Sequence, residues 1–125
     1  MDDINDIIKL IIKSSYKIYN NLGAGFLEKV YEKALLIELK ELGLIVERQF
    51  PIAIYYKDEN IGNYFADIFV EERLIIELKT SENLSLAHER QLVNYLVATN
   101  IDDGLLINFG LSKVQIKRKF RVYKK

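Results

Sequence analysis

The chain has 125 residues, half of them apolar, with 18 basic and 18 acidic side chains, one histidine and no cysteine. This length fits one domain with its own core, and the missing cysteines exclude disulfides, thiolate catalysis and zinc fingers. A single histidine also excludes a His-rich metal centre. No leader segment opens the chain and no apolar run is long enough for a membrane helix, so we expect a cytoplasmic protein without a membrane partner.

Two helices are predicted at the start of the chain. Apolar residues recur three or four positions apart in residues 4–20 and predict an amphipathic helix, and residues 26–42 predict a second helix that ends at Gly43. The segment "NLGAG" separates them. It is a poor phosphate-binding loop, because a helix and not a strand precedes it and no lysine followed by serine or threonine comes after it. We expect a turn that places Glu28 and Tyr31 on one helix face; if that face meets solvent, Glu28 only compensates the helix dipole.

The rest of the chain predicts five strands and one more helix. Three strands, rich in β-branched and aromatic residues, are expected at 44–56, 60–70 and 73–80. Ser85 is expected to cap a helix over residues 86–100, and two further strands follow at 104–110 and 114–123. The order ααβββαββ predicts an α/β (α+β) fold in which helices flank a mixed sheet, with residues 1–125 forming a single domain.

The C-terminal segment, residues 113–125, carries seven basic side chains, and no acidic residue follows Asp103. Such a segment is typical of a solvated strand edge, and it is also typical of an electrostatic contact with nucleic acid. The sequence leaves both interpretations open.

Charged side chains interrupt two of the apolar strands. Glu77 and Lys79 point to the same face of the third strand, about 7 Å apart, and Asp67 interrupts the preceding strand. Burying charges in a sheet costs free energy unless they are paired or needed for function. Two carboxylates suit Mg²⁺ or Mn²⁺, and Lys79 can orient or deprotonate an attacking water and stabilise charge on a phosphoryl oxygen. An ion pair between Lys79 and one acid explains the same pattern without catalysis.

The loop between these two strands decides whether the acids meet. Directly opposed residues share a face, so Asp67 lies opposite Glu77 only if Val70 opposes Leu74. That register requires a three-residue loop over residues 71–73 or a bulged equivalent, which we predict.

Asp67 followed by Glu77-Leu78-Lys79 resembles the D…(D/E)-x-K signature of the PD-(D/E)XK nuclease superfamily, with Ala66 in place of the usual proline. The stretch "GFLEKVY", from Gly25 to Tyr31, is similar to the motif of the GxxExxY protein family, which is assigned to that superfamily. The likeness continues through "ERQFPIAIYY", "ADIFVE", "IIELK", "HERQLVNYL" and "GLLINFG", nearly the whole chain.

The resemblance implies a restriction-endonuclease-like fold and a metal-dependent nuclease that hydrolyses phosphodiester bonds of DNA or RNA, with DNA the favoured partner. It implies Asp67, Glu77, Lys79 and Glu28 as catalytic residues. Asp67, Glu77, Glu28 and the backbone carbonyl of Leu78 are then the expected ligands of Mg²⁺ or Mn²⁺.

Substrate contacts are expected from the third helix. Gln91 and Tyr95 match a Q-x-x-x-Y motif of one nuclease branch, and His88 lies on the same face one turn earlier. With Tyr31 they form the expected substrate-binding set; ordinary packing on a helix surface is the alternative. A nuclease core of this size is expected to need a homodimer or partner protein to grip its substrate. A non-catalytic nucleic-acid-binding or assembly module is the alternative function.

Overall fold

The computed structural model describes residues 3–121 and has the element order expected from the sequence. The helices are α1 (Ile4–Leu22), α2 (Glu28–Glu41) and α3 (Leu86–Thr99), and the strands are β1 (Val46–Tyr56), β2 (Glu59–Val70), β3 (Leu74–Lys79), β4 (Asp103–Phe109) and β5 (Val114–Phe120). The predicted order ααβββαββ is confirmed, and the end of the last predicted strand, residues 122–123, lies outside the described residues. No helix within the described range is long and apolar enough to cross a membrane.

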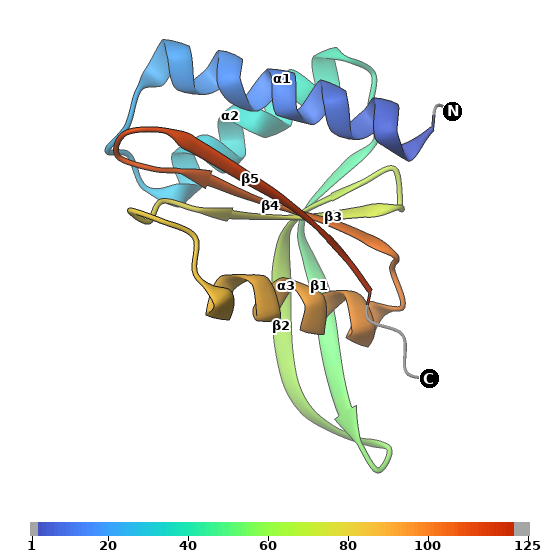
Figure 1. Ribbon diagram of the computed structural model, residues 1–125. Helices are drawn as coiled ribbons and strands as arrows, with labels where there is room; N and C mark the ends of the chain where they lie inside the picture. Colours follow the sequence, from blue (N-terminus) through green and yellow to red (C-terminus); the bar gives the residue numbers. More distant parts are fainter. Residues whose placement is uncertain (1–2, 122–125) are drawn as a thin grey trace.

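The five strands form one sheet in the order β1-β2-β3-β4-β5. Helices α1 and α2 cover one face of this sheet, and α3 covers the other (Figure 1). Neighbouring strands are antiparallel except β3 and β4, which are parallel because α3 carries the chain across the sheet between them. The sheet is therefore mixed, as predicted.

Strand β3 is buried on both faces. Ile76 packs with Ile11 and Leu35 in the core under α1 and α2, whereas its neighbour Ile75 packs with Leu92 in a second core under α3. Successive side chains of a strand point to opposite faces, so consecutive residues of β3 contribute alternately to the two cores. A charged residue in this strand is consequently surrounded by apolar layers.

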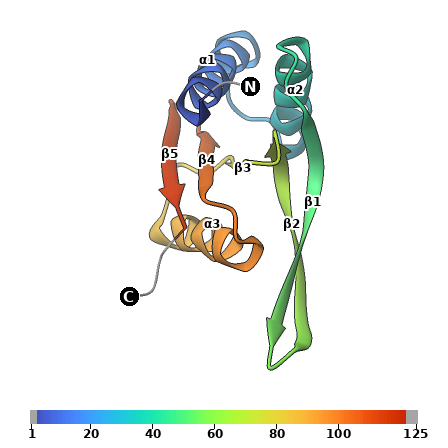
Figure 2. The same ribbon diagram turned by 90° about the vertical axis from the view of Figure 1, so that its right-hand side faces the viewer.

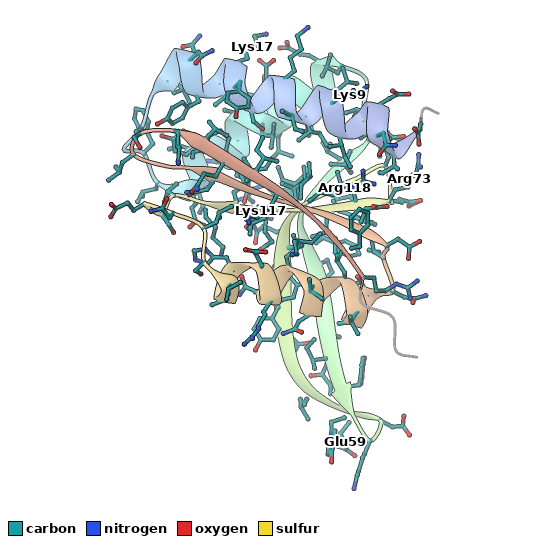
Figure 3. All side chains as sticks on the ribbon, in the orientation of Figure 1. Lys9, Lys17, Glu59, Arg73, Lys117 and Arg118 are labelled. Atoms are coloured by element: carbon teal, nitrogen blue, oxygen red, sulfur yellow. The ribbon has the colours of Figure 1, made fainter. Side chains whose placement is uncertain are left out.

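The β1–β2 hairpin continues beyond the sheet as a two-stranded arm beside α3 (Figures 1 and 2). Its turn consists of Lys57 and Asp58, which both have positive φ angles of 48° and 65°. Two such residues form the type I′ turn that matches the twist of a hairpin. Glu59 lies at the tip of the arm, away from the helices (Figure 3).

Along this hairpin, the face that packs against α1 and α2 at one end packs against α3 at the other end. Val46 and Ile68 pack in the core under α1 and α2, whereas Ile52 and Ala66, which have the same parity, pack in the core under α3. Gln49, with a positive φ of 55°, lies between the two parts of β1. Gln49, with its left-handed backbone conformation, thus lies where the hairpin changes the face that it buries, and beyond this point the arm packs against α3.

The predicted loop between β2 and β3 is confirmed. Val70 is paired with Leu74, which leaves the three residues 71–73 in the turn. Glu71 and Glu72 both have φ of 54°, and the amide of Arg73 donates to the Val70 carbonyl over 3.0 Å. The register required for Asp67 to lie opposite Glu77 is therefore present.

The predicted helix caps also form. Gly43 has a φ of 82° and its amide donates to the Lys40 carbonyl, while the Leu44 amide donates to the Leu39 carbonyl. This pair of bonds is a Schellman motif, which favours glycine because of the positive φ. Ser85 caps α3, as expected.

The segment between α1 and α2 is held from inside the core by Tyr31. The Tyr31 hydroxyl donates to the Gly23 carbonyl over 2.6 Å and accepts a hydrogen bond from the Phe26 amide. The ring is fully buried and stacks on Phe109 with centroids 4.5 Å apart. Tyr31 therefore anchors this segment, and its burial gives no support to the expected substrate contact.

Tyr31→Phe is expected to lower the free energy of unfolding by about 1–2 kcal/mol, because it removes both hydrogen bonds of the hydroxyl while keeping the stacked ring. Urea unfolding measures this loss. Tyr16→Phe is the matched control: Tyr16 is exposed, its hydroxyl has no hydrogen bond to residues 3–121, and its change should stay within about 0.5 kcal/mol. Equal stability of the wild type and Tyr31→Phe would contradict the anchoring role.

Candidate active site

The candidate site lies where β2 and β3 separate. Their pairing runs from Val70 and Leu74 to Ile68 and Ile76, and then β2 continues beside β1 while β3 continues beside β4 (Figure 2). Asp67 and Glu77 occupy the next position on the two strands. We call this position the strand fork.

Side chains replace the backbone ladder at the strand fork. The Asp67 amide donates to Oε2 of Glu77 over 2.8 Å, and the Leu78 amide donates to Oδ2 of Asp67 over 2.7 Å. Each carboxylate is therefore fixed by the backbone of the opposite strand. The remaining oxygens, Oδ1 of Asp67 and Oε1 of Glu77, have no hydrogen-bond donor within residues 3–121 and remain available to a ligand.

Both carboxyl groups resist ionisation. Burial raises the pKa of Glu77 to about 8, and the charge of Asp67 adds to this shift. Burial likewise raises the pKa of Asp67 to about 6, with further contributions from the charges of Glu32 and Glu28, against the opposing effect of the Leu78 hydrogen bond. Two acids with raised pKa values in one place, one buried and one half-buried, are typical of a site that binds a cation or moves a proton.

Lys79 is held by α3 and not by an acid. Its Nζ donates to Oε1 of Gln91 over 3.1 Å, and the structure contains no ion pair between Lys79 and any acid of residues 3–121. The positive charge is nevertheless close enough to lower the pKa values of both Asp67 and Glu77. The simple internal ion pair considered from the sequence is thus not what the structure shows.

Tyr95 approaches the strand fork from α3. Its side chain is 6% exposed, and burial raises the pKa of its hydroxyl to about 12, together with the nearby charge of Glu77. Its ring centroid lies 5.7 Å from that of Tyr64 on β2. Helix α3 therefore brings both residues of the predicted pair, Gln91 and Tyr95, to the site.

His88 has a structural partner instead. Its Nδ1 accepts a hydrogen bond from the Ser85 amide, while its own amide donates to the Ser85 hydroxyl, each over 3.2 Å. The two bonds form a capping box at the start of α3. A substrate contact by His88 stays a prediction that this placement does not support.

Glu28 is the first residue of α2 and is exposed. Its negative charge contributes to the raised pKa values of both Asp67 and Glu77, so α2 points its N-terminal end toward the strand fork. Within the described part of the chain, however, no three His, Cys, Asp or Glu side chains gather closely enough to hold a metal ion. Metal binding by Glu28, like that by the Leu78 carbonyl, stays a prediction.

Glu32 of α2, which was not among the residues predicted from the sequence, links α2 to β1 beside the site. Glu32 is buried and accepts hydrogen bonds from Nε of Arg48 and, over 2.9 Å, from Nε2 of Gln49. By the register of β1 and β2, Gln49 lies opposite Asp67. The spacing of Glu28 and Glu32, four residues apart on one helix, was the available signal.

The basic side chains of β5 are paired with acids of α3 and β4. Lys117 and Lys119 both contact Glu89 of α3, at 3.6 and 2.9 Å, and Arg118 contacts Asp103 of β4 at 2.8 Å (Figure 3). These pairs fit the strand-edge interpretation of the described part of the basic segment. They give no support to a nucleic-acid contact there.

The metal-free protein is expected to lose stability as the pH rises from 4.5 to about 8, because folded Glu77 keeps a proton that the unfolded chain has lost. Glu77→Gln keeps the acceptor for the Asp67 amide and removes this loss, which amounts to about 4–5 kcal/mol. Urea unfolding in EDTA, at about pH 5 and about pH 9, measures the difference.

The exposed Glu82 supplies the control, since Glu82→Gln should leave the pH dependence unchanged. A wild-type stability that is the same at both pH values, or a Glu77→Gln variant with undiminished pH dependence, would show that Glu77 ionises normally in the folded protein.

Comparison with known proteins identifies the superfamily and supports the fold. The family model of the PD-(D/E)XK nuclease superfamily matches residues 5–119. The crystal structure of SSO0001 is similar, with a TM-score of 0.62 and 20% sequence identity over 78% of this chain, which spans about half of that protein, 52%. No curated protein matches. The element order and mixed sheet are consistent with the restriction-endonuclease-like fold. The chain belongs to the PD-(D/E)XK nuclease superfamily.

Proposed function

We propose that the protein is a Mg²⁺- or Mn²⁺-dependent nuclease of the GxxExxY family that hydrolyses phosphodiester bonds, with DNA as the favoured substrate. The observation that carries the proposal is the strand fork, where the half-buried Asp67 and the buried Glu77 lie together with raised pKa values. Lys79 lies beside them, held by Gln91. Neutral amide side chains could accept the same backbone hydrogen bonds, so closing the sheet does not by itself explain two acids that repel each other.

The donor set of the strand fork fits Mg²⁺ or Mn²⁺. Mg²⁺ is commonly held by one or two carboxylates and keeps several waters, and Asp67 and Glu77 each offer one oxygen without a hydrogen-bond donor in residues 3–121. The first turn of α2 places Glu28 at the edge, where it would act through a water. When bound, the ion would neutralise the two acids and make a coordinated water more acidic.

The chain's own groups supply the remaining parts of a hydrolytic site. An ammonium group has three N–H donors, and Lys79 uses one of them on Gln91. The other two can orient an attacking water and stabilise the negative charge that grows on a phosphoryl oxygen. Gln91 has the role of a positioning residue, because it fixes the direction of the ammonium group from α3.

The grip on the substrate has to come from elsewhere than β5. Its basic side chains are paired with Glu89 of α3 and Asp103 of β4. We therefore propose that a second copy or a partner protein helps to hold the substrate. We also propose that residues 1–125 form one domain and that the protein acts in the cytoplasm.

Cleavage of labelled single-stranded, duplex and branched DNA and RNA with Mg²⁺ or Mn²⁺ tests the function. Lys79→Ala is expected to lower kcat/KM by about 10²- to 10⁴-fold, since a positioned proton donor or acceptor contributes that much. Lys9→Ala, which changes an exposed lysine on α1, should retain full activity. Activity that survives Lys79→Ala would place the chemistry at another site or in a contaminant.

Asp67→Asn separates the nuclease from the non-catalytic alternative. At a concentration near 100 times Kd, Mg²⁺ should stabilise the wild type by about 2.7 kcal/mol and leave Asp67→Asn unchanged, as measured by thermal unfolding. Asp58→Asn, at the tip of the arm, is the matched control. Nucleic-acid binding without metal binding or cleavage would favour the binding or assembly module.

A double-mutant cycle tests the role of Gln91. Gln91→Ala should lower kcat about 10-fold in the wild type, because the ammonium group of Lys79 loses its direction, and should change kcat little in Lys79→Ala. Additive losses of kcat would show that Gln91 acts independently of Lys79.

A further inference from the structure

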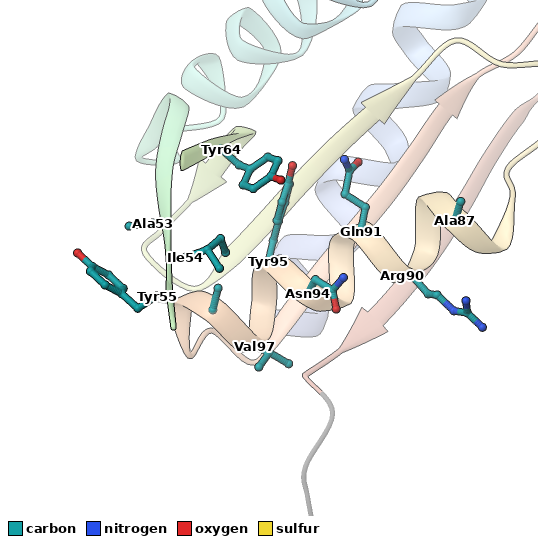
Figure 4. Close-up of a pocket in the computed structure, with 11 residues that line it drawn as sticks. Ala53, Ile54, Tyr55, Tyr64, Ala87, Arg90, Gln91, Asn94, Tyr95 and Val97 are labelled. Atoms are coloured by element: carbon teal, nitrogen blue, oxygen red, sulfur yellow. The ribbon is translucent and has the colours of Figure 1, made fainter. Parts of the chain in front are cut away.

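A groove of about 820 Å³ lies between the β1–β2 arm and α3 (Figure 4). Its volume is within the range of about 300–1,000 Å³ that is common for ligand sites. The residues on which the argument rests are Tyr64 on the arm and Arg90, Gln91, Asn94 and Tyr95 on α3. The function proposed above uses only the end of this groove.

The groove begins at the strand fork. Gln91, which lines it, binds Lys79, and Tyr95, which also lines it, lies close enough to Glu77 for that charge to raise the pKa of its hydroxyl. The polar ends of Gln91 and Tyr95 point to the same side in Figure 4. A molecule with one end at the carboxylates can therefore continue directly into the groove.

The walls of the groove have aromatic and polar components. Tyr64 is 49% exposed, so its ring offers an uncovered face, whereas the ring of Tyr55 points away from α3 (Figure 4). Tyr64 also packs beside Tyr95, with an angle of 43° between the rings (Figure 4). Asn94 is exposed, and its amide, which can both donate and accept, makes no hydrogen bond within residues 3–121.

The charge of the groove is positive. Arg90 is exposed, and nothing in residues 3–121 pairs with its guanidinium group. None of the residues that line the groove is acidic. An anionic chain thus meets one cation here and no like charge.

We propose that this groove holds unpaired nucleotides next to the scissile phosphate, so that the substrate is single-stranded at the point of cleavage. This inference rests on the nuclease function proposed above. A base stacks on the ring of Tyr64, the Asn94 amide contacts a base edge, and Arg90 binds the backbone. Aromatic stacking with a cation beside it is the usual way in which proteins bind single strands.

Base stacking within a duplex prevents the same contacts. In a double helix each base is covered on both faces by its neighbours, so a tyrosine can stack on it only after it has been unstacked, at a cost of a few kcal/mol. The groove therefore favours single-stranded over double-stranded nucleic acid without reading a sequence.

Fluorescence anisotropy with EDTA, which prevents cleavage, tests the groove directly. The probes are a fluorescein-labelled single-stranded DNA of about 12 nucleotides, the RNA of the same sequence, and the blunt DNA duplex. The wild type should bind the single strands at least about 10-fold more tightly than the duplex. Tyr64→Ala should weaken single-strand binding about 5- to 100-fold, and Tyr64→Phe, which keeps the ring, should bind as the wild type does.

Tyr56→Ala is the matched control. Tyr56 is a tyrosine of the same arm, 63% exposed, that does not line the groove, so its replacement should leave the single-strand affinity unchanged. Thermal unfolding of each variant verifies the fold. Equal affinity for single strand and duplex, or an equal loss in Tyr64→Ala and Tyr56→Ala, would overturn the inference.

Different experimental results would contradict the proposed role of the groove and the proposed nuclease function. Loss of single-strand affinity in Tyr64→Ala without any cleavage by the wild type would support the groove and refute the nuclease. Cleavage of duplex by the wild type at the rate of single strands, undiminished in Tyr64→Ala, would support the nuclease and refute the groove.

Discussion

The exchange of hydrogen bonds between Asp67 and β3 is the constraint on which the candidate site depends. Where β2 and β3 separate, each strand would leave backbone amides without acceptors, and a buried unpaired amide is costly. The carboxylates of Asp67 and Glu77 accept from these amides. The same groups therefore close the sheet and present their remaining oxygens to a ligand, so the site is rigid because the fold requires it to be.

Three layers of the molecule meet at this point. Helix α2 brings the charges of Glu28 and Glu32, and α3 brings Gln91 and Tyr95. The sheet supplies the two acids and Lys79. Burial by these layers is the main reason why both acids have raised pKa values. A cation that neutralised the acids would remove an electrostatic cost that the folded protein otherwise carries, and this links binding to stability.

The β1–β2 arm forms one wall of the groove next to the site. The β1–β2 hairpin turns over near Gln49, and its far end comes to lie against α3 with Tyr64 beside Tyr95. A flat continuation of the sheet would have left these rings facing solvent on separate elements. The twist of the hairpin instead creates a groove that leads away from the strand fork. The groove thus extends from the side chains beside the carboxylates to the exposed ring of Tyr64.

The sequence by itself determined the order of elements, the caps at Gly43 and Ser85, and the register that opposes Asp67 and Glu77, because periodicity, capping and loop length are local properties. It also pointed to Gln91 and Tyr95. Only the tertiary structure decided that Tyr31 is an anchor inside the core and that Glu32 links α2 to β1 beside the site. These outcomes depend on which layers cover each side chain and on the strand fork, and both result from the packing of segments that are distant in the sequence.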